Sequence, residues 1–414
     1  MEQLLEFDPF SVEVVADPYP SFEELLRTGP VHWIESRQMF MVVGYDLVSA
    51  VVRDPTVFSS KLGYSAMSSG AMSQGADVDM NSVVGVDVSA LRQLISTDPP
   101  DHVRIRRLVS RAFTPKAVAE LEPRLRNACT ELVSGLIANA KKGDADVVRD
   151  VASPFPVTVI AELLGVSPDH RNDFRRWSDA LAGALSGNLD MDEATMAGAE
   201  AITFLAQAVE ERLVNPADDL MSRLLAGSTE GDPDTLSIDE VIANSLLFLA
   251  AGSETTTNLI SNAVAALAAH PDQAQQLFAA PEKLPAMIEE VLRWDSPVQG
   301  LFRGTTRPTT LAGIDLPEGA LVFVSFAAAN RDPSHFEEPD RFDITRNSRD
   351  HLAFGHGVHH CIGAPLARLE ARLIFETLLR TGTALEPTDG AVRSTSAFLR
   401  GFQQLPVTCA SVEV

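Results

Sequence analysis

The segment 237–270 predicts a single very long helix, and this constrains the fold more than any other feature of the chain. It begins with a capping box, in which Ser237 precedes Glu240 by three residues, and it stops at Pro271. At 1.5 Å per residue such a helix is roughly 50 Å long, enough to cross a whole domain. Its middle is apolar on nearly every side, so we expect it to be buried within protein. Polar residues inside it argue against a membrane span.

A polar break interrupts the apolar middle of this helix, at Gly252, Glu254, Thr255 and Thr256. Serine and threonine hydroxyls often bond the preceding helical turn, so one interpretation has these side chains face a solvent channel without a chemical role. In the functional interpretation, the Thr255 hydroxyl opens the helix locally and delivers protons together with the Glu254 carboxylate.

The remaining patterns predict a mainly α (α+β) fold. Helical patterns with proline stops occupy residues 101–300, whereas strand patterns place a smaller β-rich part at approximately 1–60 and 297–345. The stretch 62–97 is rich in Gly, Ser, Met and Ala, and we expect a long binding loop or lid with a short helix near its end. No internal repeat or low-complexity linker divides the 414 residues.

Charge and cysteine content limit the functional classes. The net charge is −24, which argues against sequence-independent binding to nucleic acid or to an anionic membrane surface. The three cysteines, Cys129, Cys361 and Cys409, are too few and scattered for a disulfide framework, so we expect a reducing, cytoplasmic setting. The first residues carry no basic segment followed by an apolar run, so neither secretion nor an N-terminal anchor is expected.

The stretch AFGHGVHHCIGAPLARLE, residues 353–370, places a cysteine after two glycines and directly before a predicted helix. In a first interpretation the glycines only allow a turn, and the cysteine is a small buried hydrophobe. In a second, zinc binds to His356, His359, His360 and Cys361, although no second cysteine pair supplies the usual spacing. In a third, the helix N-terminus stabilises a thiolate that ligates haem iron, and the glycines let a flat macrocycle approach closely.

The segment FGHGVHHCIG resembles the haem-binding loop of the cytochrome P450 family, in its bacterial soluble branch. The match covers every fixed position of that loop: Phe354, Gly355, Gly357, His359, Cys361 and Gly363. The resemblance implies heme b as the cofactor, with Cys361 as its axial ligand. The haem is then expected between the long central helix and the helix that follows the cysteine. The resemblance covers essentially the whole chain and implies a single cytochrome P450 domain over 1–414.

Other motifs of the family have counterparts here. AGSETT is similar to the central-helix motif, which implies that Thr255 is the catalytic alcohol and Glu254 the catalytic acid. Three segments resemble the parts of the family that contact the haem and its propionates: the cysteine loop, DPPDHVRIRRLV and SPVQGLFRGTT. The resemblance implies such contacts from Phe354, Gly355, Gly363, His359, His102, Arg106 and Arg303. A structural Glu-Arg-Arg network behind the haem loop is implied at Glu290, Arg293 and Arg341.

By this resemblance we expect a monooxygenase that inserts one oxygen atom from O2 into a hydrophobic small molecule. The chain has no Gly-rich dinucleotide fingerprint and no cysteine set for an iron–sulfur cluster. Electrons from NAD(P)H are therefore expected to arrive through a ferredoxin and its ferredoxin reductase, and the protein is expected to be a monomer. A basic docking face, or else an ordinary solvated helix face, is expected at Arg104, Arg107, Arg111 and Lys116.

Family positions also indicate substrate contacts, mainly apolar with one polar anchor, at Leu247, Ala250, Ala251, Gln299, Leu301, Phe398 and Leu399. The expected substrate is a natural-product intermediate of polyketide or terpenoid type, as in antibiotic biosynthesis. Three alternatives remain: a peroxide-dependent peroxygenase, a non-catalytic haem-binding sensor, and a zinc-binding structural protein.

Overall fold

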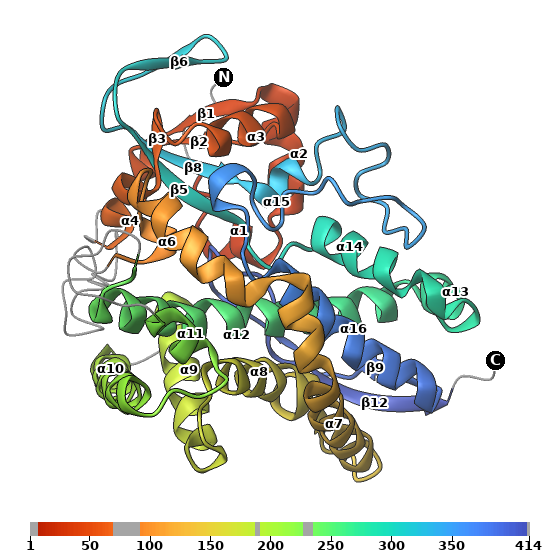
Figure 1. The fold of residues 1–414 in the computed structure, drawn as a ribbon. Helices are drawn as coiled ribbons and strands as arrows, with labels where there is room; N and C mark the ends of the chain where they lie inside the picture. Colours follow the sequence, from red (N-terminus) through yellow and green to blue (C-terminus); the bar gives the residue numbers. More distant parts are fainter. Residues whose placement is uncertain (1–6, 69–91, 187–190, 227–234, 412–414) are drawn as a thin grey trace.

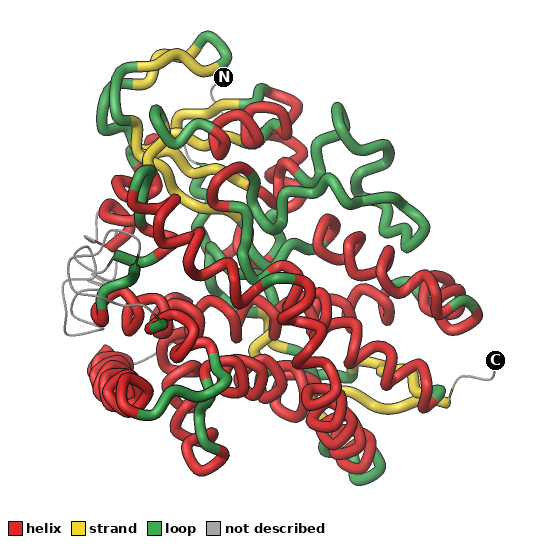
Figure 2. Tube along the Cα trace, in the orientation of Figure 1, coloured by secondary structure: helices red, strands yellow, loops and turns green. Residues whose placement is uncertain are grey.

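The computed structural model describes residues 7–68, 92–186, 191–226 and 235–411 (Figure 1). Helices cover most of the molecule, and strands are gathered in two separate places (Figure 2). This confirms the predicted mainly α, α+β fold.

The helical body comes from the middle of the chain and from one long helix after Cys361. Prolines begin several of its helices, because proline lacks an N–H and its fixed φ suits the first turn. Within the described ranges the body comprises α6 (Asp101–Val109), α7 (Pro115–Ala140), α8 (Pro154–Leu164), α9 (Arg171–Ser186), α10 (Met191–Val214), α11 (Leu220–Leu225), α12 (Ile238–Ala269), α13 (Pro271–Ala279), α14 (Leu284–Trp294) and α16 (Ala364–Thr381).

The larger sheet joins the beginning of the chain to residues 300–325, in the order β1-β2-β8-β5-β3. β2 and β8 are parallel, and the other neighbours are antiparallel. The valines of α3 pack against the valines of this sheet. The elements of this region are α1 (Val12–Ala16), α2 (Tyr19–Thr28), β1 (Val31–Ile34), β2 (Met39–Val42), α3 (Tyr45–Arg53), β3 (Phe58–Ser59), α4 (Ser60–Ser68), β5 (Gly300–Thr305), β6 (Thr309–Leu311), β7 (Ile314–Leu316), β8 (Leu321–Ser325) and α15 (Phe326–Ala329).

Smaller sheets lie outside the two stretches in which strands were predicted. One has the order β4-β12-β9, and β10 pairs with β11. Their strands are short and flank the helical body, so their sequence signals are weak: β4 (Ala145–Asp146), β9 (Thr383–Pro387), β10 (Val392–Arg393), β11 (Phe402–Gln404) and β12 (Pro406–Ser411).

The predicted loop 62–97 is described only at its ends. Its first residues belong to α4 and are helical, which differs from the prediction. The short helix expected near its end is a 3₁₀ turn at Leu94–Ser96. Residues 69–91 lie outside the described part of the chain.

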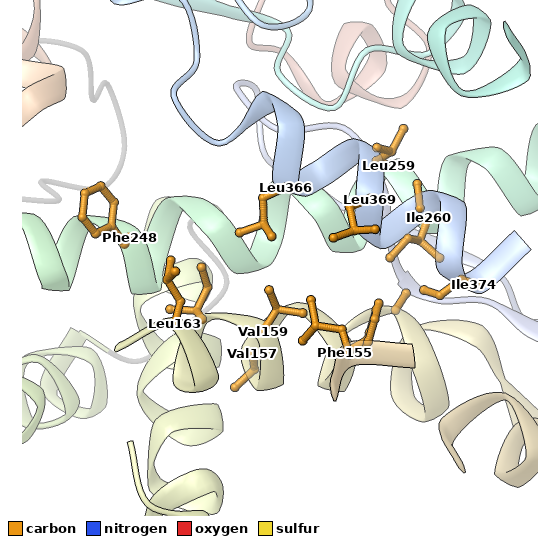
Figure 3. Packing of buried hydrophobic residues seen from close by; sticks show 14 of the residues in the cluster. Phe155, Val157, Val159, Leu163, Phe248, Leu259, Ile260, Leu366, Leu369 and Ile374 are labelled. Atoms are coloured by element: carbon orange, nitrogen blue, oxygen red, sulfur yellow. The ribbon is translucent and has the colours of Figure 1, made fainter. Parts of the chain in front are cut away.

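The long helix is confirmed as α12. The Ser237 hydroxyl accepts the Glu240 N–H at 3.2 Å, and the Glu240 carboxylate accepts the Ser237 N–H at 2.9 Å. α12 packs against both α8 and α16, and Figure 3 shows apolar side chains of the three helices meeting. The helix is therefore buried along much of its length, as predicted.

Candidate active site

A cavity of about 390 Å³ lies where α12, β5 and the 353–363 loop meet. Its walls are mostly apolar, with side chains such as Ile160, Leu246 and Leu292. Cys361 borders it from the loop, and Thr255 borders it from α12. The fold thus brings the cysteine and the polar break of the long helix to one cavity.

The cysteine loop turns sharply before α16. The Cys361 N–H donates to the Phe354 carbonyl at 2.8 Å, which closes the loop on itself. Gly355 and Gly357 have φ values of +66° and +70°, in the left-handed region that favours glycine. A Cβ on Gly357 would lie 2.8 Å from the Val52 carbonyl oxygen of α3. The backbone conformation therefore favours glycine at both positions, and the close approach to α3 also requires it at position 357.

Opposing influences act on the Cys361 sulfur. Cys361 is exposed to the cavity, yet desolvation by the surrounding protein raises the pKa of its thiol, whereas the N–H groups of Gly363 and Ala364 and the charge of Arg106 lower it. These two amides belong to the beginning of α16, where the helix dipole also favours a negative charge. The sulfur is thus held where a thiolate gains hydrogen bonds and a cation.

Two arginines from distant segments border the same cavity. Arg303, from β5, is 5% exposed, and burial lowers the pKa of its guanidinium to about 10. It donates to the Phe302 carbonyl at 2.7 Å, and Arg106, from α6, donates to the His360 carbonyl at 2.7 Å. Neither arginine forms an ion pair with a carboxylate of the described residues.

Two histidines complete this basic group. The rings of His102 and His359 lie 4.1 Å apart between centroids. Burial, and then the charge of Arg106, lowers the pKa of His102 to about 4, and burial with the neighbouring basic groups lowers that of His359 to about 2. Within the described ranges, neither Nε2 atom has a hydrogen-bond partner. Arg106, Arg303 and His359 therefore border the cavity with donors available for an anion, and His102 lies against the His359 ring without bordering the cavity itself.

The polar break of α12 differs from its prediction in one respect. The Thr255 hydroxyl donates to the Ala251 carbonyl at 2.7 Å, and the helix continues through this position. The expected local opening of the helix is thus not present, because the hydroxyl satisfies its donor within the preceding turn. Glu254 is half-buried on the same turn. Gly252 leaves space for Ile160, whose Cδ1 would lie 2.7 Å from an added Cβ.

The predicted ion pair behind the loop forms. Glu290 and Arg293 are both fully buried, and Arg293 donates to both carboxylate oxygens at 2.8 Å. Ser348 donates to Glu290 at 2.5 Å. The remaining donors of Arg293 reach main-chain carbonyls of residues 330–341. The pair therefore fastens α14 to the coil that leads to the cysteine loop.

The third member of this network was assigned to the wrong arginine. The Arg341 side chain is 58% exposed and pairs with Glu338 and Asp343, and Arg341 contributes its carbonyl to Arg293 instead. Arg346 donates to Glu290 at 3.3 Å, with its side chain 17% exposed. This coil has no hydrophobic periodicity that would indicate which residue faces inward, so the sequence alone did not distinguish Arg341 from Arg346.

Most of the predicted substrate positions border the cavity, namely Leu247, Ala250, Ala251, Leu301, Phe398 and Leu399. Gln299 does not, which corrects the prediction of a polar anchor there. Its Nε2 donates to the Ser296 carbonyl at 2.7 Å, and the side chain faces the N-terminal region near Phe10. β5 begins only at Gly300, so the alternation that points Leu301 into the cavity does not extend to Gln299.

Sequence reasoning missed a carboxyl group in the cavity wall. Glu370 of α16 borders the cavity at 2% exposure, and burial raises the pKa of its carboxyl well above the usual range. No described residue hydrogen-bonds its Oε2. The signal in the sequence was a glutamate among apolar residues on the inner face of a helix, ARLEARL.

The predicted basic docking face is smaller than expected. Arg104 turns inward to an ion pair with Glu240 and donates to the Thr235 carbonyl at 2.9 Å. Arg107 and Lys116 are exposed, and the side chain of Arg111 lies outside the described residues. Glu240 attracts Arg104 because α12 passes beside α6, which the sequence could not indicate.

A sequence model described as Cytochrome P450 matches residues 185–281 and 282–399. The chain belongs to the cytochrome P450 family. Its relatives include the cytochrome P450 monooxygenase PikC of Streptomyces venezuelae, 37% identical over 98% of this chain and 94% of that protein. The 6-deoxyerythronolide B hydroxylase of Saccharopolyspora erythraea is 34% identical over 97% of this chain and 98% of that protein.

Solved cytochrome P450 structures share the fold. The structure of CYP109Q5 from Chondromyces apiculatus has a TM-score of 0.85 and 37% sequence identity, over 99% of this chain and all of that one. Family membership makes this chain an enzyme of the monooxygenase class and implies a haem cofactor.

The residues of this cytochrome P450 fit such a cofactor. Haem carries two carboxylates, and the cavity wall offers Arg106, Arg303 and His359, with His102 packed against the His359 ring behind it. Within the described residues, the Nε2 atoms of both histidines have no hydrogen-bond partner. Gly363 also borders the cavity beside Cys361, and an added Cβ there would lie at an ordinary contact distance, 3.8 Å, from the sulfur. The sulfur could hold the iron, and the basic group could hold the carboxylates.

The zinc alternative finds no support in the described residues, which contain no group of three or more His, Cys, Asp or Glu side chains placed to hold a metal ion.

Among the described helices, none is long and apolar enough to cross a membrane.

Proposed function

We propose that this cytochrome P450 inserts one oxygen atom from O2 into an apolar small molecule, a natural-product intermediate of polyketide or terpenoid type. The observation that carries the proposal is the shared cavity, which has Cys361 on its wall, Thr255 beside it and mostly apolar side chains around both. The electrons come from NAD(P)H through a ferredoxin and its reductase, and the enzyme works as a cytoplasmic monomer.

Each part of the cavity has a task in this proposal. The chemistry supplied by a bound haem is the activation of O2, which a thiolate ligand favours because it donates electron density to the iron. The apolar walls would orient the substrate and exclude water, while Arg106, Arg303 and His359 on the cavity wall, with His102 behind His359, would hold the propionates. Thr255, on the cavity wall, would hold a proton at its hydroxyl, and Glu254, on the same turn but outside the cavity lining, would supply protons to it.

The cavity supports an apolar substrate more strongly than a polar one. Leu247 and Ala250 border it from α12, Leu301 from β5, and Phe398 and Leu399 from the loop before β11. With Gln299 turned away, the predicted polar anchor is missing from this set. Burial of apolar surface, at about 25 cal/mol per Å², would then provide most of the binding free energy.

The first experiment is the absorption spectrum of the reduced holoenzyme with carbon monoxide. The wild type should show the long-wavelength Soret band of a thiolate-ligated ferrous carbonyl, and Cys361→Ala should lose it. Cys129→Ala is the matched control, because Cys129 is buried against Thr377 of α16 and does not border the cavity. A wild type with the spectrum of a histidine-ligated globin, or without bound haem, would overturn the proposal.

The second experiment separates the monooxygenase from the alternatives. A panel of polyketides and terpenoids is screened by the change of the Soret band on binding, and a binder is turned over with ferredoxin, reductase and NAD(P)H. Faster turnover with hydrogen peroxide alone would favour a peroxygenase. Binding without any product under either condition would favour a sensor.

A further inference from the structure

Glu289 of α14 is a buried carboxylate at the centre of a second network behind the cysteine loop. Arg368 of α16 donates to it through Nε at 2.6 Å and through Nη2 at 2.8 Å. The Nε2 atom of His351 lies 3.1 Å from the Glu289 carboxylate. Glu289 is 8% exposed, and it is separate from the Glu290 pair although the two residues are neighbours.

One partner of Glu289 contacts the Phe354 ring, and the other contacts the residue before Phe354. The guanidinium of Arg368 lies over this ring, 4.6 Å from its centroid. The Ala353 N–H donates to His351 Nδ1 at 3.2 Å. Since Nδ1 accepts, the imidazole proton sits on Nε2 and is donated to Glu289. One carboxylate therefore fixes the backbone before Phe354 and the cation above its ring.

Phe354 continues this chain of contacts to the sulfur ligand. Its carbonyl accepts the N–H of Cys361 at 2.8 Å, and the ring borders the cavity. The positive charge of Arg368 is among the influences that lower the pKa of the Cys361 thiol. Glu289 thus acts on Cys361 through Arg368 and Phe354, while its own hydrogen bonds are to Arg368 and His351.

The Glu289 carboxyl is ionised at neutral pH. Burial alone would raise the pKa of this carboxyl, but the hydrogen bonds from Arg368 and His351 outweigh burial and lower the pKa to about 2. The carboxylate therefore neutralises Arg368, whose side chain is 35% exposed, beside the loop. Removing that negative charge would leave the positive charge of Arg368 uncompensated near the sulfur.

We propose that Glu289 is a positioning residue for the thiolate loop, which holds Arg368 on Phe354 and thereby sets the reduction potential of the haem iron. The inference rests on the proposed function, because it requires haem bound through Cys361. An uncompensated cation near the sulfur stabilises the ferrous state, which carries one more negative charge than the ferric state. Loss of the Glu289 charge should therefore make the potential more positive.

The test is spectroelectrochemistry of the substrate-free holoenzyme, which needs neither substrate nor ferredoxin. In Glu289→Gln, the ferrous to ferric ratio at a fixed potential should rise roughly tenfold, the effect of one charge at moderate distance. For a one-electron couple this equals about 59 mV. Glu282→Gln removes the same charge from an exposed position just before α14 and should leave the potential unchanged.

Further variants distinguish electrostatic positioning from a general loss of structure. Arg368→Gln should shift the potential in the opposite direction, and Glu289→Gln combined with Arg368→Gln should return it toward the wild-type value. If Glu289→Gln fails to bind haem, Glu289→Asp keeps the charge and should keep the potential. An unchanged reduction potential in Glu289→Gln would overturn the inference. So would a double variant whose potential is shifted as far as that of Glu289→Gln. A wild type without the thiolate signature would instead contradict the proposed function.

Discussion

The Nε–H of Arg400 donates a 2.7 Å hydrogen bond to the carboxylate of Asp295, across 105 residues of sequence. Tyr19 of α2 donates to the same oxygen at 2.6 Å, and Arg393 donates to the other at 3.1 Å. Asp295 is 2% exposed and follows directly after α14. This carboxylate therefore joins the N-terminal region, α14 and the loop that brings Phe398 and Leu399 to the cavity.

Replacing Asp295 with Asn should destabilise the protein by about 3–5 kcal/mol, because the buried Arg400 and the partly buried Arg393 lose their counter-charge. Burial raises the pKa of this carboxyl, but Arg400 and Arg393 outweigh burial and lower it. The stabilisation is thus fully present above the unfolded pKa, about 3.9, and is lost as pH falls through the folded pKa. Urea unfolding at pH 7 measures the loss, with Asp315→Asn on the exposed β7 as control. A loss below about 1 kcal/mol would contradict the role of this network.

The two candidate arginines of the Glu290 network should differ in stability. Arg346→Ala removes three donated bonds, one to the fully buried Glu290 carboxylate and two to main-chain carbonyls, and should cost about 1–3 kcal/mol. Arg341→Ala removes an exposed pair, keeps the carbonyl that Arg293 uses, and should cost below about 1 kcal/mol. Thermal unfolding of the holoenzymes compares the two. Equal losses would contradict the assignment of Arg346.

Thr255→Ala should reduce product formed per O2 consumed, with more peroxide released and a roughly ten- to hundredfold lower rate of product formation. The helix should stay intact, because the hydroxyl bonds only the preceding turn at Ala251. Thr203→Ala is the matched control: its hydroxyl makes the same bond to Ala199, at 2.8 Å, on an exposed face of α10. Unchanged coupling of O2 to product in Thr255→Ala would remove Thr255 from the proton path.

Glu370→Gln should become more stable relative to the wild type as pH rises. Burial raises the folded pKa of this carboxyl, so the wild type loses stability above the unfolded pKa of about 4.3. The difference should grow by about 1.4 kcal/mol per pH unit until the folded pKa is reached. Unfolding at pH 5 and pH 7 measures it, with the exposed Glu386→Gln as control. A difference that does not change with pH would show that Glu370 is not held neutral.

Local patterns determined much of the fold and the identity of the site. The capping box at Ser237 and the stop before Pro271 set the bounds of α12, because caps and prolines act within a single turn. The glycines around Cys361 and the helix behind it also depend on neighbouring residues alone. These features, with the resemblance that they carry, sufficed for the family. Thr255 and six of the seven positions predicted to contact substrate border the cavity, and their contact with substrate stays a prediction.

The partners of buried charges were decided only by the tertiary structure. Arg346 rather than Arg341 reaches Glu290, and Arg104 turns to Glu240, because coil and helix packing bring distant groups together. Glu289 forms hydrogen bonds with Arg368 and His351, which lie 79 and 62 residues away in the sequence. A buried charge must find a partner wherever the packed chain supplies one, since leaving it unpaired costs several kcal/mol. Sequence periodicity shows that a residue faces inward, but which residue it meets there depends on how the helices pack.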